Sequence, residues 1–173
     1  ENWTIQGLNS VSINGINFSN IQSINVNASD NISSRTLNGT SGKDDFTITA
    51  TNAVSAMGIT YYGVGTVNGL LSDDDTVSGS NSWNLLSNGF ESTGISFLST
   101  EIANSTAAGT VTGTDSKDEF LITGTESVKV KETTFNNVAN VDGALGDDDT
   151  VSGSNTWNLL STGFESSGIS FLS

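Results

Sequence analysis

The chain has 173 residues, a formal net charge of −14 and only five lysine or arginine residues, and it contains no proline, cysteine or histidine. Five basic residues are too few to follow a nucleic-acid backbone or to hold an anionic membrane surface, so we expect neither partner. Without cysteine there are no disulfides and no thiolate metal sites. No apolar run approaches about 18 residues, so the sequence predicts no membrane-spanning segment.

The N-terminal residues 1–35 carry short triplets in which apolar and polar residues alternate. Examples are Trp3-Thr4-Ile5, Val11-Ser12-Ile13 and Ile16-Asn17-Phe18. Alternation places both apolar side chains on one face of an extended strand. Glycine, asparagine and serine separate the triplets and are typical of turns. This segment resembles the units that follow it, and we interpret it as a degenerate half-repeat.

The rest of the chain is a tandem repeat with a period of about 74 residues, in which position 73 corresponds to position 147. We assign residues 36–109 to the first repeat and residues 110–173, which are truncated, to the second, all within one continuous solenoid. The stretch 73–99 returns at 147–173 with three substitutions of small polar residues. A motif of threonine, apolar, polar and glycine recurs at Thr36, Thr76, Thr110 and Thr150, so each repeat consists of two halves of about 37 residues.

Short strands at close spacing in a tandem repeat predict an all-β fold, a right-handed parallel β-helix (β-solenoid) in which counterparts stack on one another. Three coil sizes remain open: one turn per half, two turns per half, or three turns per repeat. An interior aromatic column is expected from Phe46, Trp83, Phe120 and Trp157. The alternative for the two tryptophans is a platform on which a sugar ring stacks.

Acidic clusters precede equivalent strands and are the one candidate for site chemistry. A solenoid is expected to bring them to one edge, where stacked carboxylates repel and a hard cation such as Ca²⁺ relieves the repulsion. The alternative is that they are solvated turn residues that protect a strand edge from pairing. The candidate calcium ligands are Asp73, Asp74, Asp75, Asp147, Asp148 and Asp149.

The text from Gly143 to Val151 resembles one calcium-binding nonapeptide of secreted RTX proteins, with Ala144 in place of the second glycine and one extra aspartate. More broadly, the order of an acidic turn, a short strand and a Gly-Ile-x-aromatic segment resembles the repeats of filamentous-haemagglutinin-like bacterial exoproteins. That resemblance implies a parallel β-helix, export to the cell surface, and a role in adhesion, matrix or filament formation. It implies no catalytic residue.

We therefore expect a non-catalytic structural or adhesive segment of a longer extracellular protein on a bacterial cell surface. Its expected partners are copies of itself, assembled end to end or side by side, or glycans of a cell surface or matrix. The alternatives are a calcium-stabilised carbohydrate-binding module, a polysaccharide-active β-helix enzyme, and an ice- or mineral-binding surface. Acidic groups that recur along the repeat favour a scaffold over an enzyme, because catalytic groups normally occur once.

Overall fold

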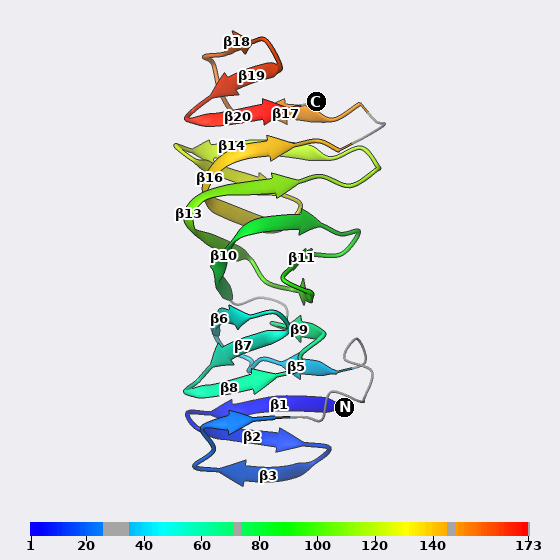
Figure 1. The fold of residues 1–173 in the computed structure, drawn as a ribbon, viewed down its shortest axis with the longest axis vertical. Coiled ribbons are helices and arrows are strands. Elements are labelled where there is room, and N and C mark those ends of the chain that lie inside the picture. Colours follow the sequence, from blue (N-terminus) through cyan, green and yellow to red (C-terminus); the bar gives the residue numbers. More distant parts are fainter. Residues whose placement is uncertain (26–34, 71–73, 145–147, 173) are drawn as a thin grey trace.

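The computed structural model describes residues 1–25, 35–70, 74–144 and 148–172, and within these ranges every regular element is a β-strand (Figure 1). The strands are β1 (Asn2–Gly7), β2 (Ser10–Ile13), β3 (Ile16–Ser19), β4 (Ser23–Ile24), β5 (Thr36–Asn38), β6 (Asp45–Ala50), β7 (Ala53–Ala56), β8 (Ile59–Tyr62), β9 (Thr66–Asn68), β10 (Thr76–Leu85), β11 (Phe90–Ser92), β12 (Ile95–Leu98), β13 (Ile102–Thr112), β14 (Glu119–Gly124), β15 (Ser127–Val130), β16 (Thr133–Asp142), β17 (Thr150–Ser152), β18 (Asn158–Leu160), β19 (Gly163–Ser166) and β20 (Ile169–Leu172).

The strands form two long ladders along the molecular axis. In ladder 1, hydrogen-bonded neighbours follow the order β3-β2-β1-β5-β9-β12-β11-β10-β13-β16-β20-β19-β18. In ladder 2 the order is β4-β8-β7-β6-β10-β13-β16-β15-β14-β17. The long strands β10, β13 and β16 enter both, and they join the ladders into one 20-stranded sheet.

Parallel stacking and antiparallel meanders alternate along each ladder. In ladder 1, β5, β9 and β12 are parallel, and β12, β11 and β10 form a meander. In ladder 2, β16, β15 and β14 form the matching meander. The expected fold class, an all-β solenoid with coils stacked in parallel, is confirmed. The meanders were not foreseen, because a strand alternates in the same way in both kinds of pair.

The coil size agrees with one of the three alternatives left open by the sequence, three turns per repeat. Between β5 and its counterpart part of β13, the chain passes from ladder 1 to ladder 2 and back three times, through β6–β8, the first part of β10 and the first part of β13. Thr36 pairs with Thr66, and Glu119 pairs with Thr150, so a parallel step of a ladder spans about 30 residues of chain, within the usual range of solenoid repeats. Counterparts one full repeat apart are therefore not neighbours in the ladders. The path from β5 to its counterpart β13 passes through β9, β12, β11 and β10, which makes five steps. At about 4.8 Å a step, one repeat lengthens the molecule by about 24 Å.

One hydrophobic core fills the space between the ladders. Side chains along β6 and β14 are alternately exposed and buried, as the triplets predicted. Trp3 of ladder 1 stacks on Tyr61 of ladder 2 with ring centroids 6.0 Å apart. One repeat later, Phe90 of ladder 1 meets Phe135 of ladder 2 edge to face at 5.3 Å. The inward side chains of the two ladders thus interlock along the axis.

Candidate functional site

Acidic residues stand at the corners where the chain passes from ladder 1 to ladder 2. Asp44, before β6, and Asp118, before β14, are both buried. One oxygen of Asp44 accepts hydrogen bonds from the backbone N–H and the hydroxyl of Thr40, at 2.5 and 3.1 Å. Asp118 accepts the matching pair from Thr114, at 2.6 and 3.0 Å. Each carboxylate therefore caps the turn that leads into its own strand.

The corner carboxylates also link one layer to the next. Asp75 Oδ1 accepts the backbone N–H of Asp44 at 2.6 Å, and Glu101 Oε2 accepts that of Asp75 at 3.0 Å. In the second repeat, Asp149 Oδ1 accepts the N–H of Asp118 at 2.8 Å. An ionised carboxylate accepts hydrogen bonds only, so each contact satisfies a backbone donor at a corner.

Glycines leave the space that these carboxylates occupy. A methyl group on Gly69 would overlap the carboxylate of Asp75, and one on Gly143 would overlap that of Asp149. The pairing of glycine with aspartate is thus part of how the chain turns each corner. The structure assigns the buried aspartates a role in the architecture.

The six predicted calcium ligands lie in different surroundings. Asp75 is buried, Asp149 is half-buried, Asp74 and Asp148 are exposed, and Asp73 and Asp147 lie outside the described residues. Within the part of the chain that the structure describes, no three His, Cys, Asp or Glu side chains are grouped to hold a metal ion. Calcium takes six to eight oxygen ligands, and Asp75 and Asp149, whose Oδ1 atoms accept backbone N–H groups, do not provide such a set.

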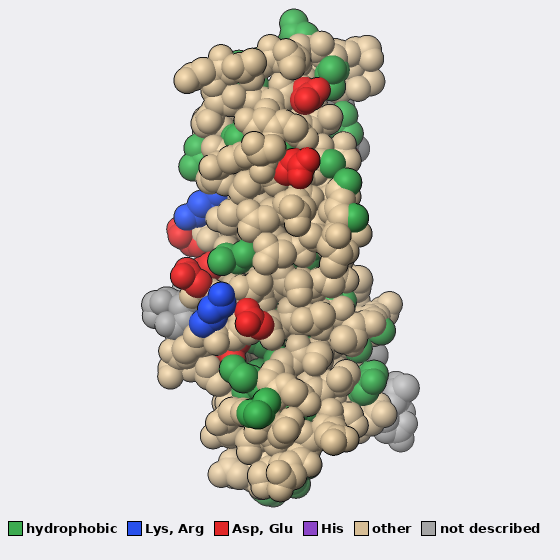
Figure 2. Space-filling model, turned by 90° about the vertical axis from the view of Figure 1, so that its left-hand side faces the viewer, with side chains coloured by type: hydrophobic (Ala, Val, Ile, Leu, Met, Phe, Trp, Pro, Cys, Tyr) green, Lys and Arg blue, Asp and Glu red, His purple; other side chains and the backbone are tan. Residues whose placement is uncertain are grey.

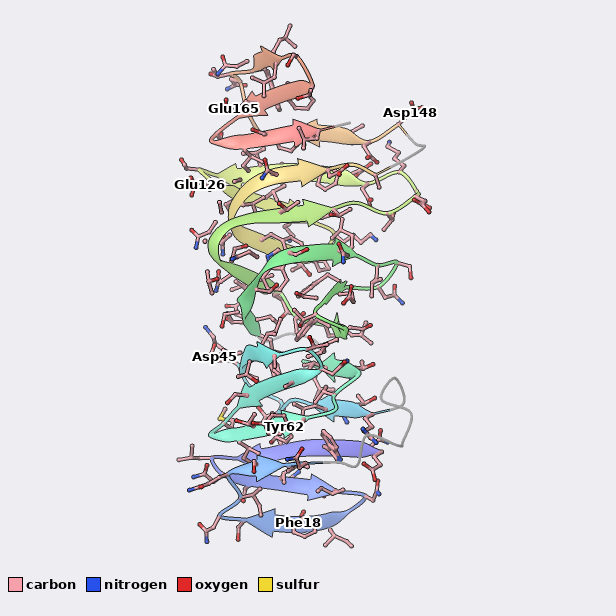
Figure 3. The ribbon with its side chains drawn as sticks, in the orientation of Figure 1. Phe18, Asp45, Tyr62, Glu126, Asp148 and Glu165 are labelled. Carbon is pink, nitrogen blue, oxygen red and sulfur yellow. The ribbon has the colours of Figure 1, made fainter. Side chains whose placement is uncertain are left out.

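The acidic residues are stacked where the chain passes from ladder 1 to ladder 2, but they do not form one continuous row. In Figure 3, Asp45 and Asp148 project on opposite sides of the long axis. The contacts between corner carboxylates run from Asp44 through Asp75 to Glu101. In the next layer the corner residue is Thr133, whose hydroxyl donates to the carbonyl of Thr100 at 2.8 Å.

The predicted column of four aromatic residues is wrong. Phe46 and Phe120 belong to ladder 2, whereas Trp83 and Trp157 belong to the ladder 1 side, because successive half-repeats place their matching strands in opposite ladders. Each paired aromatic stacks on an aliphatic residue instead: Phe46 on Val77, Phe120 on Val151 and Trp83 on Val111. Only Phe46, Trp83 and Phe120 are buried, and Trp157 is 41% exposed.

The surroundings of Trp83 exclude a sugar platform at that residue. Its indole N–H donates to the hydroxyl of Ser105 at 2.8 Å, and its ring meets Phe90 at 5.6 Å and Phe135 at 6.4 Å. Ser105 lies on β13 and Phe135 on β16, and these two strands cover the β10–β12 meander that holds Trp83. Trp157 keeps the matching contact with Phe164 at 5.4 Å, but no described layer covers it from the other side.

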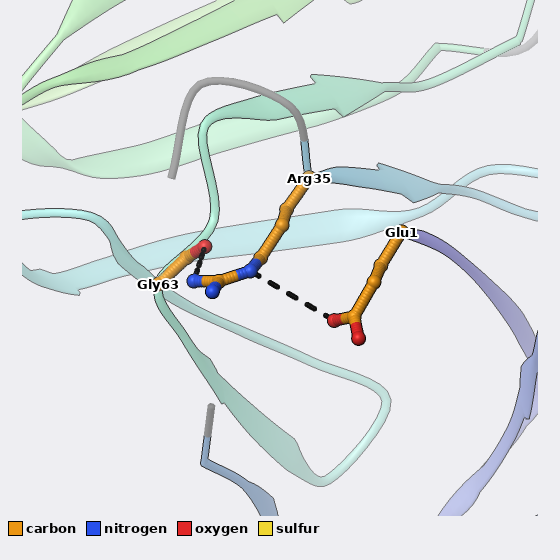
Figure 4. A network of polar contacts seen from close by, with 3 residues as sticks. All are labelled: Glu1, Arg35 and Gly63. Carbon is orange, nitrogen blue, oxygen red and sulfur yellow. Dashed lines mark hydrogen bonds and ion pairs between the residues drawn. The ribbon is translucent and has the colours of Figure 1, made fainter. Parts of the chain in front are cut away.

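The interior near the first repeat also holds polar groups. Arg35 is buried, and its guanidinium donates to the carbonyl of Gly63 at 3.4 Å and lies 3.8 Å from the Glu1 carboxylate (Figure 4). The Tyr61 hydroxyl is buried and has no hydrogen-bond partner among the described residues. Burial, with a smaller contribution from the charge of Asp44, raises the pKa of Tyr61 above its usual value.

A feature that sequence reasoning missed lies at the turn between β15 and β16. Lys131 and Glu132 stand there, where the first repeat has Met57 and Gly58. The turn borders a hollow of about 390 Å³, and Lys131 also borders a second hollow of about 550 Å³ over β14 and β15. The local departure from an otherwise close repeat was the signal available in the sequence.

No family model, curated protein or solved structure matches this chain. Among the described residues, no helix has the length and apolar character needed to cross a membrane.

Proposed function

We propose that this chain is a non-catalytic structural and adhesive repeat segment of an extracellular bacterial surface protein or filament. In this role it extends a rod, joins copies of itself end to end, and presents its sides for attachment to cell-surface or matrix glycans. The proposal is supported most by the repeat itself. The outermost described layers match interior layers, so a further layer of the same kind fits on each of them, whether it comes from the same chain or from another copy.

Residues at the ends of the ladders are more exposed than their counterparts in interior layers. At one end Trp157 and Leu159 are 41% and 89% exposed, whereas their counterparts Trp83 and Leu85 are 0% and 7% exposed. At the other end Phe18 of β3 is 40% exposed, whereas Phe97, in the matching third strand of the next ladder 1 meander, is fully buried. Among the described residues, each end offers apolar side chains and a strand edge without a partner, which favours the addition of a further strand of the same chain or of another copy.

The two ends are also compatible in direction. β3 and β18 are outer strands of three-stranded meanders, and inside the molecule the matching outer strands β12 and β10 pair with parallel strands, β9 and β13. A second copy stacked end to end would extend ladder 1 in the same way. A heterologous contact of this kind does not close on itself, so it produces filaments.

The charge pattern supports a partner other than nucleic acid. Lys117 lies 3.6 Å from Glu119, and Lys129 lies 3.8 Å from Glu132. On the face shown in Figure 2, basic side chains lie beside acidic ones and form no basic tract. Phosphate backbones are bound by continuous basic surfaces, which this face lacks.

Sedimentation velocity and negative-stain electron microscopy over a concentration series test the proposal. We expect elongated oligomers whose length grows with concentration. Leu159→Lys, which places a charge on the outermost strand, should abolish them, and Leu121→Lys, an exposed position on the side of the rod, should not. A chain that stays monomeric at millimolar concentration, or a Leu159→Lys variant that assembles as well as the parent chain, would contradict end-to-end assembly. Immunolabelling of intact source cells tests the surface location.

A further inference from the structure

A hollow of about 390 Å³ lies where three turns meet, the β10–β11, β12–β13 and β15–β16 turns. Its volume lies within the range of about 300–1,000 Å³ that is common for small-molecule sites. The polar side chains around it include Asn88, Glu101, Lys131 and Glu132, and the aliphatic ones include Leu85 and Leu98.

The same junction is closed one repeat earlier. There the Leu8-Asn9 turn rests directly on the turn formed by Met57 and Gly58. The N–H of Asn9 donates to the carbonyl of Met57 at 2.8 Å, and the side chains of Leu8 and Asn9 lie against Gly58. The fold alone therefore does not require an opening at this position.

Lys131 and Glu132 change the junction in the second repeat. The ammonium of Lys131 donates to the carbonyls of Leu86 and Ser87, at 2.8 and 3.3 Å. The two turns are thus held apart by the length of a lysine side chain rather than packed against one another. The hollow arises from residues in which the second repeat departs from the first.

The lining calls for a ligand that both donates and accepts hydrogen bonds. Ionised Glu101 and Glu132 are acceptors, Lys131 is a donor, and the Asn88 amide is both. Thr100, which also lines the hollow and is 4% exposed, has a buried hydroxyl with no hydrogen-bond partner among the described residues. A sugar hydroxyl serves each of these groups, and the C–H face of a sugar ring packs on aliphatic side chains. Two carboxylates and a net charge of −14 disfavour phosphate or sulfate.

We infer that this hollow binds one or two units of a neutral glycan. The inference rests on the proposed attachment role and deepens it, because it gives that role a site and a ligand class. The site is independent of the rod ends, so binding and assembly are separate properties of the chain. It occurs at the junction between the first and second repeats, and its counterpart around Met57 is filled.

Nuclear magnetic resonance titration of the labelled chain tests this inference. The probes are the methyl glycosides of glucose, galactose, mannose and N-acetylglucosamine, each added to tens of millimolar. We expect at least one of them to shift the amide resonances of Asn88, Lys131 and Glu132 in a saturable manner.

Variants make the test specific. Ser87→Trp fills the mouth of the hollow and should weaken binding by about tenfold or more, whereas Ser161→Trp, the same change at the counterpart turn, should leave binding unchanged. The double variant K131M/E132G restores the residues of the first repeat and should also lose binding. Melting curves show whether each variant is folded.

Two results would overturn the inference. The first is that none of the four glycosides shifts these resonances. The second is that Ser161→Trp weakens binding as much as Ser87→Trp. If sedimentation still shows elongated oligomers in either case, the proposed structural role stands and only the glycan site is lost.

Discussion

Trp83 and Trp157 occupy the same position of the repeat but have different surroundings, so alanine substitutions at the two sites should differ in cost. Trp83 is fully buried and donates a hydrogen bond to Ser105, whereas Trp157 is 41% exposed and covered on one side only. The near identity of the two stretches, taken alone, predicts equal costs. The comparison therefore tests the layer assignment rather than the composition of the core.

The expected magnitudes follow from burial. Replacing a fully buried tryptophan by alanine costs about 3–5 kcal/mol of unfolding free energy. For a chain of this size, each kcal/mol lowers the melting temperature by about 2–4 °C, so Trp83→Ala should lower it by about 6–20 °C. Trp157→Ala should cost less than about half as much. Part of its ring is already hydrated, and an end layer opens without unfolding the layers beneath it.

Urea and thermal unfolding followed by far-ultraviolet circular dichroism measure both costs. Ser105→Ala serves as a control for the hydrogen bond and should cost about 1 kcal/mol. Equal losses at Trp83 and Trp157, or a larger loss at Trp157, would refute the assignment of Trp83 to the interior and Trp157 to an outer layer.

Three further predictions concern the corners and the core. Tyr61→Phe should stabilise the chain by about 1–3 kcal/mol, since it removes a buried hydroxyl without a described partner. Below about pH 10 Tyr61 is protonated in both the folded and the unfolded state. Above about pH 10 the unfolded chain loses the Tyr61 proton first, so the free energy of unfolding falls by up to about 1.4 kcal/mol per pH unit. Urea titrations at several pH values should show that Tyr61→Phe removes this pH dependence. Gly69→Ala, whose methyl group meets the carboxylate of Asp75 and a backbone carbonyl, should cost about 1–3 kcal/mol or more. Gly124→Ala, whose methyl group would meet Ser127 only at an ordinary contact distance of 3.9 Å, should be tolerated, and chemical denaturation compares the two. Millimolar calcium or a chelator should leave the melting temperature unchanged, and a rise of several degrees with calcium would contradict the assignment of the described aspartates as caps.

The sequence predicted the positions of the strands better than it predicted which strands pair with one another. Triplets such as Phe46-Thr47-Ile48 show which side chains turn inward, and the structure buries Phe46 and Ile48 and exposes Thr47. Alternation says nothing about which strand lies alongside or in which direction it runs. Phe46 and its counterpart Phe120 are therefore related by sequence but separated by five steps of the ladder.

The acidic corners were located correctly in the sequence, but their role depended on backbone groups that a sequence does not display. Whether Asp44 binds a cation or caps a turn is decided by the N–H group of Thr40, which the fold brings to it. The junction hollow was missed for another reason. Its signal was a difference between two repeats, Lys131 in place of Met57, whereas the predicted site residues are positions that the repeats share.

The separation between Thr47 and Leu121 tests the central claim most directly. Both side chains are exposed, on the counterpart strands β6 and β14, and the chain has no cysteine, so two introduced cysteines carry spin labels without interference. Five steps of the ladder predict a distance of about 24 Å between the labelled backbone sites by electron–electron double resonance. A distance of about 10 Å, which two stacked coils per repeat would give, would contradict the account.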